Sequence, residues 1–255
     1  MTRSRRATRE ERRRQELDER RARRRGRRGE PQRSRLLPLS LGALALGVVA
    51  VAVFIVVTAP PAAVELREPT APSAYTLADG QALGRADAPV TIEIYSDFQC
   101  PACGTLARTI KPLLMRDYVD TGEVRLVYRD FAFLGPESVD AAVAARCAAS
   151  ENRFWQFHDY LFANQQGENR GAFSRPRLEA MGEAVGLDAD TQRACIADPA
   201  VRQEVTDERA AAAELQINST PTLVIDDEQR IQGVPDYASL QAAIEARLAQ
   251  SRAER

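Results

Sequence analysis

The chain has 255 residues and a net charge of −1, with 28% charged and 44% hydrophobic residues. The length allows one or two folded domains. The near-zero total hides an asymmetry, because residues 1–35 hold 16 Arg against 6 acidic residues while the remainder is acidic. These arginines are interleaved with acids such as Glu10 and Glu11, a pattern that argues against nucleic-acid binding.

Residues 36–58 carry no charged side chain. At about 1.5 Å per residue, this stretch of 23 residues is long enough to span a hydrocarbon core of about 30 Å. We interpret it as a transmembrane signal-anchor. A cleaved signal peptide is the alternative, but its apolar region is usually about 7–15 residues, and Pro60 would hinder cleavage.

The arginine excess directly precedes the expected span, which predicts a cytoplasmic N-terminal tail (1–35) and an extracytoplasmic remainder at the cell membrane. Attraction to anionic lipid is the simplest further role for the tail. Paired arginines such as Arg5-Arg6 also fit a twin-arginine export signal, but arginine is too frequent here for that match to be informative.

Residues 59–80 contain four prolines among small residues and lack a hydrophobic period, which predicts an extended linker. The exported domain is then expected over 81–250, a length sufficient for one core.

Within this domain, β-branched and aromatic runs predict two strands at 90–95 and 123–128. A helix is expected between Cys103 and Gly122, with Pro112 kinking it or starting a second helix. Helical spacing dominates about 132–216. Further on, the pattern predicts a strand at 222–226, a return strand at 231–233 and an amphipathic helix at 237–248. The order predicts an α/β domain with a helical insertion.

The segment Cys100-Pro101-Ala102-Cys103 lies where the first strand ends and a helix begins. Free backbone N–H groups and the positive end of the helix dipole favour a thiolate there, so we expect Cys100 to be the nucleophile or leaving group. Pro101 suits the first helical position, because its missing N–H has no partner there. A stabilised thiolate favours the dithiol over the disulfide, which predicts an oxidising pair.

Two structural alternatives exist for this pair. Cys100 and Cys103 would form half of a zinc site if Cys147 and Cys195 completed it, but those two are far apart in sequence, unlike most zinc ligand pairs. A permanent structural Cys100–Cys103 bond is the other alternative, and such a tight loop gains little from closure.

Cys147 and Cys195 fall on expected helices of the insertion. We interpret them as a structural disulfide, which for a loop of this size contributes on the order of 4 kcal/mol. A second redox relay is the alternative, although neither cysteine has a helix-start context.

Several short motifs occur in one order along about 83–248. They are Asp97-Phe98-Gln99-Cys100-Pro101-Ala102-Cys103, Arg129-Asp130-Phe131, Cys147-Ala148-Ala149, Phe154-Trp155-Gln156-Phe157-His158 and Thr220-Pro221-Thr222. Together they resemble the DsbA-like thioredoxin family, in particular its membrane-anchored branch in Gram-positive-type bacteria. The resemblance implies a thioredoxin fold, preceded here by one transmembrane helix.

The resemblance also implies a cis Thr220-Pro221 peptide bond beside the Cys100 sulfur, where the Thr220 backbone would pair with a substrate strand. It further implies a quinone-linked membrane partner that reoxidises the cysteine pair. The chain departs from the family in one respect. Relatives commonly carry a buried acid six residues before the first cysteine, where this chain has Ile94, and Glu93 would point to the opposite face of the strand.

The sequence therefore predicts a protein-disulfide oxidoreductase, most simply an oxidase acting on exported protein thiols, with Cys100 and Cys103 as its redox-active pair. A reductase or isomerase, for example in haem attachment or disulfide repair, is the first alternative, and a thiol-based metal-binding module the second. We expect no cofactor and no bound metal. His158, the only histidine, is interpreted as part of the packed core.

Overall fold

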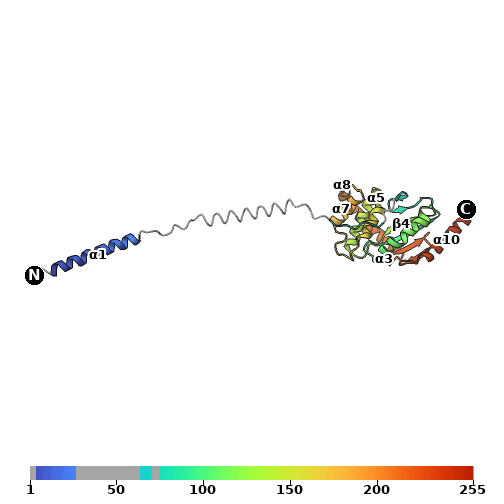
Figure 1. Cartoon of the computed structure of the whole chain (residues 1–255). Helices are drawn as coiled ribbons and strands as arrows, with labels where there is room; N and C mark the ends of the chain where they lie inside the picture. The colour runs from blue at the N-terminus through green and yellow to red at the C-terminus, as the bar shows by residue number, and fades with distance from the viewer. Residues whose placement is uncertain (1–3, 27–63, 71–74, 255) are drawn as a thin grey trace. The chain divides into compact units, whose positions relative to one another are not determined.

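The computed structural model describes residues 4–26, 64–70 and 75–254 (Figure 1). The chain divides into two units, residues 1–62 and 63–255. The expected anchor at 36–58 lies outside the described residues. Within the described ranges, no helix is both long enough and apolar enough to cross a membrane.

In the first unit, the arginine-rich segment forms helix α1 (Ser4–Gly26), which the sequence analysis did not predict. Arg, Glu and Ala are strong helix formers, which accounts for this helix without tertiary contacts. Its side chains from 12 to 23 are all exposed.

The second unit contains a mixed sheet of six strands in the order β1-β2-β4-β3-β5-β6. The two long central strands, β3 (Val90–Ser96) and β4 (Val124–Asp130), are parallel, and their predictions are confirmed. The other strands are antiparallel to their neighbours: β1 (Ala78–Asp79), β2 (Ala82–Leu83), β5 (Thr222–Ile225) and β6 (Gln229–Gln232). Strands β1 and β2 were not predicted, because two residues carry no periodic signal.

One helical segment follows β3. It comprises α3 (Pro101–Thr105), a π-helical turn (Leu106–Ile110), α4 (Lys111–Leu114) and a second π-helical turn (Met115–Val119). Pro112 lies at the start of α4. The interruption of the helix that this proline was expected to cause is therefore the π-helical turn directly before α4.

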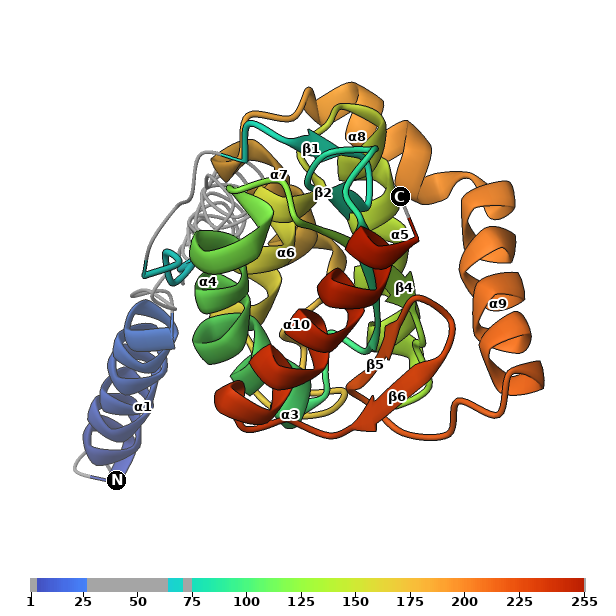
Figure 2. The same cartoon turned by 90° about the vertical axis from the view of Figure 1, so that its right-hand side faces the viewer.

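The helical insertion and a C-terminal helix complete the domain. Their bounds are α5 (Pro136–Ser150), α6 (Phe154–Ala163), α7 (Arg175–Ala184), α8 (Ala189–Ala197), α9 (Pro199–Glu214) and α10 (Tyr237–Ala253). Figure 2 shows α10 lying across the sheet, and α5 and α9 pack against each other. The predicted α/β domain with a helical insertion is therefore present.

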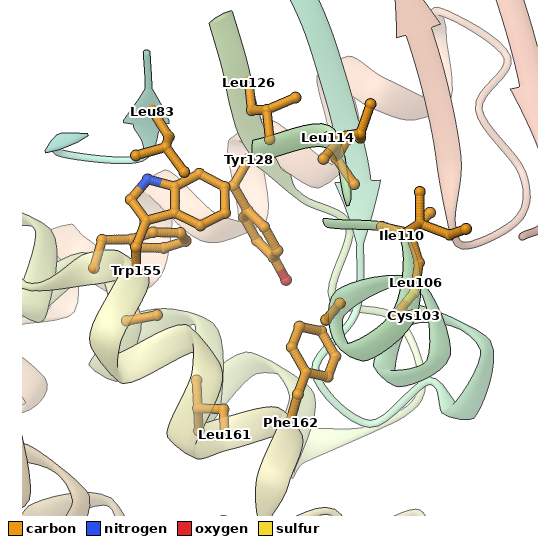
Figure 3. Packing of buried hydrophobic residues seen from close by; sticks show 14 of the residues in the cluster. Leu83, Cys103, Leu106, Ile110, Leu114, Leu126, Tyr128, Trp155, Leu161 and Phe162 are labelled. Carbon is orange, nitrogen blue, oxygen red and sulfur yellow. The ribbon is translucent and has the colours of Figure 1, made fainter. Parts of the chain in front are cut away.

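An aromatic core fills the space between the sheet and α6 (Figure 3). Trp155 is fully buried, and its indole N–H donates to the Ala82 carbonyl at 3.0 Å. His158 packs edge-on against Phe162 and Tyr128. Burial is the largest cause that lowers the His158 pKa to about 4, so the ring is neutral at pH 7. The interpretation of His158 as a core residue is confirmed.

The folded domain begins earlier than the predicted boundary at residue 81. Tyr75 is buried and β1 starts at Ala78, so residues 75–80 belong to the domain rather than to the expected extended linker. The Tyr75 phenol pairs with Lys111 and Asp159, and the Lys111 ammonium and Asp159 carboxylate form a buried ion pair. A single aromatic residue among prolines gave no pattern from which this docking could be predicted.

Candidate active site

Cys100 lies between the end of β3 and the start of α3, as predicted. It is the N-cap residue of α3, with extended backbone angles, and Pro101 occupies the first turn. The Gly104 N–H donates to the Cys100 carbonyl at 3.1 Å. The proline removes an N–H that the helix would leave unpaired, and its fixed φ suits a helix start.

Cys100 is 7% exposed, and its sulfur lies 3.4 Å from the Thr220 carbonyl oxygen, to which it donates when protonated. Its pKa is lowered to about 6, chiefly by a hydrogen bond from Cys103. Burial opposes this shift, whereas the Thr220 side chain and the backbone N–H groups of Ala102 and Cys103 add to it. Cys100 is therefore mostly thiolate at neutral pH.

Cys103 has the opposite character. It is 1% exposed, and burial followed by the neighbouring Cys100 raises its pKa. Both cysteines are free thiols in this structure. An external thiol or disulfide therefore meets Cys100 first, and Cys103 reacts only with Cys100.

Thr220 and Pro221 lie beside this sulfur and are joined by a cis peptide bond. Pro221 is buried directly before β5, and its carbonyl accepts from the Gly233 N–H at 2.8 Å. The structure thus brings Cys100, Cys103, Thr220 and Pro221 together.

Two residues that the sequence analysis did not assign hold the cysteine segment in place. The buried Asp97 carboxylate accepts hydrogen bonds from the N–H groups of Gln99, Phe133 and Leu134 and from the Ser138 hydroxyl. Gln165 of the segment after α6 donates to the Phe98 and Cys100 carbonyls at 2.7 and 3.0 Å. The only sequence signal for this support was the position of Asp97 directly after a strand. No sequence pattern pointed to Gln165.

The position of the expected family acid is apolar, because Ile94 is buried in the core. Glu93 lies on the other face of β3, where its carboxylate accepts from Arg129 and from the Tyr95 hydroxyl. The prediction that Glu93 points away from the cysteines is confirmed.

Cys147 and Cys195 are joined by a disulfide that links α5 to α8, with their Cα atoms 5.8 Å apart. A bonded pair has no thiolate to offer, so these sulfurs do not complete a zinc site with Cys100 and Cys103.

The similarities to known proteins reported below concern the second unit. The family model described as Thioredoxin matches residues 76–246. Disulfide bond formation protein D of Bacillus subtilis (strain 168) is 27% identical over 169 residues, which are 65% of this chain and 76% of that protein. The crystal structure of BdbD from Bacillus subtilis (oxidised) has a TM-score of 0.62 at 25% identity, covering 72% of this chain and all of that one.

A relative of another kind is the Na(+)/H(+) antiporter NhaA 3 of Salinispora tropica, 33% identical over 171 residues. The match covers 66% of this chain but only 25% of the antiporter, so the likeness concerns one part of that protein.

Proposed function

The chain belongs to the DsbA-like thioredoxin family of protein-disulfide oxidoreductases, and we propose that it acts as an oxidase that forms disulfides in exported proteins. The observation that carries the proposal is the contrast within the Cys100–Cys103 pair, since the pKa of Cys100 is lowered to about 6 while that of Cys103 is raised. A stabilised Cys100 thiolate favours the reduced pair, so the oxidised pair accepts electrons readily. The name of the Bacillus subtilis relative, disulfide bond formation protein D, supports the same direction.

The proposed reaction has two exchange steps. A substrate thiolate attacks the Cys100 sulfur of the oxidised pair, a mixed disulfide forms, and Cys103 leaves as a thiolate. The second substrate thiolate then attacks its own partner sulfur in the mixed disulfide, and Cys100 leaves as a stable thiolate. The substrate loses two electrons and the Cys100–Cys103 pair gains them.

Thr220 and Pro221 are the proposed substrate-binding residues. The Thr220 carbonyl lies 3.4 Å from the Cys100 sulfur, so an extended substrate segment paired with the Thr220 backbone would place its cysteine at the reacting atom. This contact positions a substrate through its main chain and leaves its sequence free, as a general oxidase requires.

The proposal includes the location expected from the sequence. Residues 36–58 would anchor the chain by a single pass, with 1–35 in the cytoplasm and the domain outside, where a quinone-linked membrane partner would reoxidise the pair. Protease treatment of intact spheroplasts tests this placement, because it should remove the domain and leave the tail protected. A domain that resists protease until the membrane is opened would refute it.

Direction of electron flow is tested by the reduction potential of the Cys100–Cys103 pair and by its state in cells. An oxidase should have a potential nearer to roughly −120 mV than to roughly −270 mV, and thiol trapping should find the pair mostly oxidised. A mostly reduced pair with a low potential would instead indicate the reductase or isomerase.

A Cys103→Ala variant should accumulate mixed disulfides through Cys100, with Cys100→Ala as the matched control that accumulates none.

A further inference from the structure

The turn that carries Cys100 is closed by two local hydrogen bonds. The Cys100 N–H donates to the Asp97 carbonyl at 3.0 Å, and the Gln99 N–H donates to Asp97 Oδ1 at 2.8 Å. These two bonds fix the shape of the turn but not its position, because both partners of each bond belong to the turn. Groups outside residues 97–100 must therefore hold it over the start of α3.

Two parts of the helical insertion hold this turn from outside. In the first turn of α5, the Ser138 hydroxyl donates to the Asp97 carboxylate at 2.7 Å. In the segment after α6, Gln165 donates to the Phe98 and Cys100 carbonyls. The insertion therefore contacts both a side chain and the main chain of the turn.

Gln99 joins these two parts of the insertion. It is 2% exposed, and its Nε2 donates to the Ser138 hydroxyl at 2.8 Å and to Asn169 Oδ1 at 3.3 Å. Its Oε1 accepts a hydrogen bond from the Asn169 N–H. These contacts use both hydrogens and the oxygen of the amide, so the polar end of Gln99 is fully paired inside the domain.

Asn169 is itself held in place by the segment that leads into α5. Its φ of 52° lies in the left-handed region, which asparagine adopts more readily than most residues. Its Nδ2 donates to the Leu134 carbonyl at 2.9 Å, and its Oδ1 accepts from the Glu137 N–H at 3.3 Å. A Cβ at Gly135 would lie 2.3 Å from Asn169 Nδ2, so a side chain there would displace the amide that meets Gln99.

The reactivity of Cys100 depends on where this turn places its sulfur. The hydrogen bond from the Cys103 thiol lowers the Cys100 pKa most, and the backbone N–H groups of Cys103 and Ala102 lower it further. Such bonds weaken steeply when their length or angle departs from the optimum. Because Gln99 directly precedes Cys100, a change in the position of Gln99 moves the sulfur and weakens these bonds.

We propose that Gln99 is a positioning residue for Cys100, through which the helical insertion holds the reactive sulfur over the start of α3. Ser138 and Asn169 fix the Gln99 side chain, and Gln99 fixes the main chain of the next residue. The insertion thereby contributes to disulfide exchange without touching a substrate. The inference rests on the proposed function, because it concerns the thiolate that this function uses.

The test compares two buried glutamines in the full chain with its Cys100–Cys103 pair reduced. Gln99→Leu removes the amide next to Cys100. Gln192→Leu is the matched control, because Gln192 is 1% exposed and donates to the Leu178 carbonyl at 3.0 Å, between α7 and α8. Both variants should have a lower free energy of unfolding, whereas only Gln99→Leu should change Cys100.

The readout is the pH dependence of Cys100 alkylation by iodoacetamide. Its midpoint should lie near 6 in the wild type and in Gln192→Leu. In Gln99→Leu the midpoint should be about one pH unit higher, which makes alkylation at pH 6 about fivefold slower. A merely structural role for Gln99 would lower stability without moving this midpoint.

Asn169→Gly keeps the test available if Gln99→Leu does not fold. Asn169 is exposed, and glycine adopts its left-handed backbone, so this variant mainly removes the side-chain contact. It should raise the midpoint by about half a pH unit alone, but not in the Gln99→Leu background, where the contact is already lost. Asn152→Gly is its control, since Asn152 is also exposed, has a φ of 57° and accepts from the Gly80 N–H; the midpoint should not change.

The positioning role is wrong if Gln99→Leu and Asn169→Gly both keep the wild-type midpoint. It is also wrong if Gln192→Leu moves the midpoint as far as Gln99→Leu does. Failure of the proposed function has a different signature, because a mostly reduced wild-type pair with a low potential would refute the oxidase. Alkylation needs no protein substrate, so the midpoints would still decide the role of Gln99.

Discussion

Replacing Cys103 by alanine should raise the pKa of Cys100 well above 7, because the hydrogen bond from Cys103 is the largest cause of its low value. At a pKa of about 6, roughly nine-tenths of Cys100 is thiolate at pH 7, against roughly one-hundredth at the ordinary value of 9.0. This difference stabilises the reduced pair by about 1.4 kcal/mol at pH 7, which makes it about 30 mV more oxidising.

The pH dependence of Cys100 alkylation by iodoacetamide measures this pKa in the full chain. Cys103→Ser is the matched control, because it keeps a donor at the same place and should retain a low pKa. Cys103→Ala should lose it. If Cys103→Ala still reacts with a midpoint near 6, the backbone N–H groups at the start of α3 alone stabilise the thiolate, and the reasoning is refuted.

Three further predictions concern stability, each measured by denaturant unfolding of the full chain. Folding lowers the His158 pKa from 6.5 to about 4, so the free energy of unfolding of the wild type decreases as the pH falls below 6.5. At pH 4 this decrease is roughly 3 kcal/mol, and His158→Phe should remove it. An unchanged pH slope would contradict this. Replacing Cys147 and Cys195 together by alanine should cost about 4 kcal/mol without changing the Cys100 pKa, and a shifted pKa would point to the redox relay instead. Asp97→Ala should lower the free energy of unfolding by at least about 3 kcal/mol, because it leaves buried donors unpaired. Asp140→Ala at the surface is the control and should lower it by under about 1 kcal/mol. Equal losses in the two variants would refute this reasoning.

The central elements were predictable because their local signals and their packing agree. The apolar run at 90–95 became β3, and the helical spacing of 132–216 became α5 to α9. The position of the cysteine segment was equally predictable. It follows the end of a strand and Pro101 starts a helix, which together leave one arrangement for Cys100.

What the sequence did not predict depends on contacts between distant residues. Tyr75 docks on Lys111 and Asp159, partners far along the chain, and no local pattern encodes that choice. Gln165 supports the Cys100 loop from another segment for the same reason. Asp130 was visible within a motif, but its burial beside Tyr128 follows only from the strand register.

The docking of Tyr75 decides where a shortened chain can begin. A fragment starting at residue 81 would lack the phenol that pairs with Lys111 and would uncover one side of Trp155, whose ring centroid lies 6.1 Å from that of Tyr75. Starting at residue 64 also keeps the paired hydrogen bonds between the Arg67 backbone and the Asn164 side chain. Fragments made for crystallisation or binding studies should therefore retain this leading segment, although it looks dispensable in the sequence.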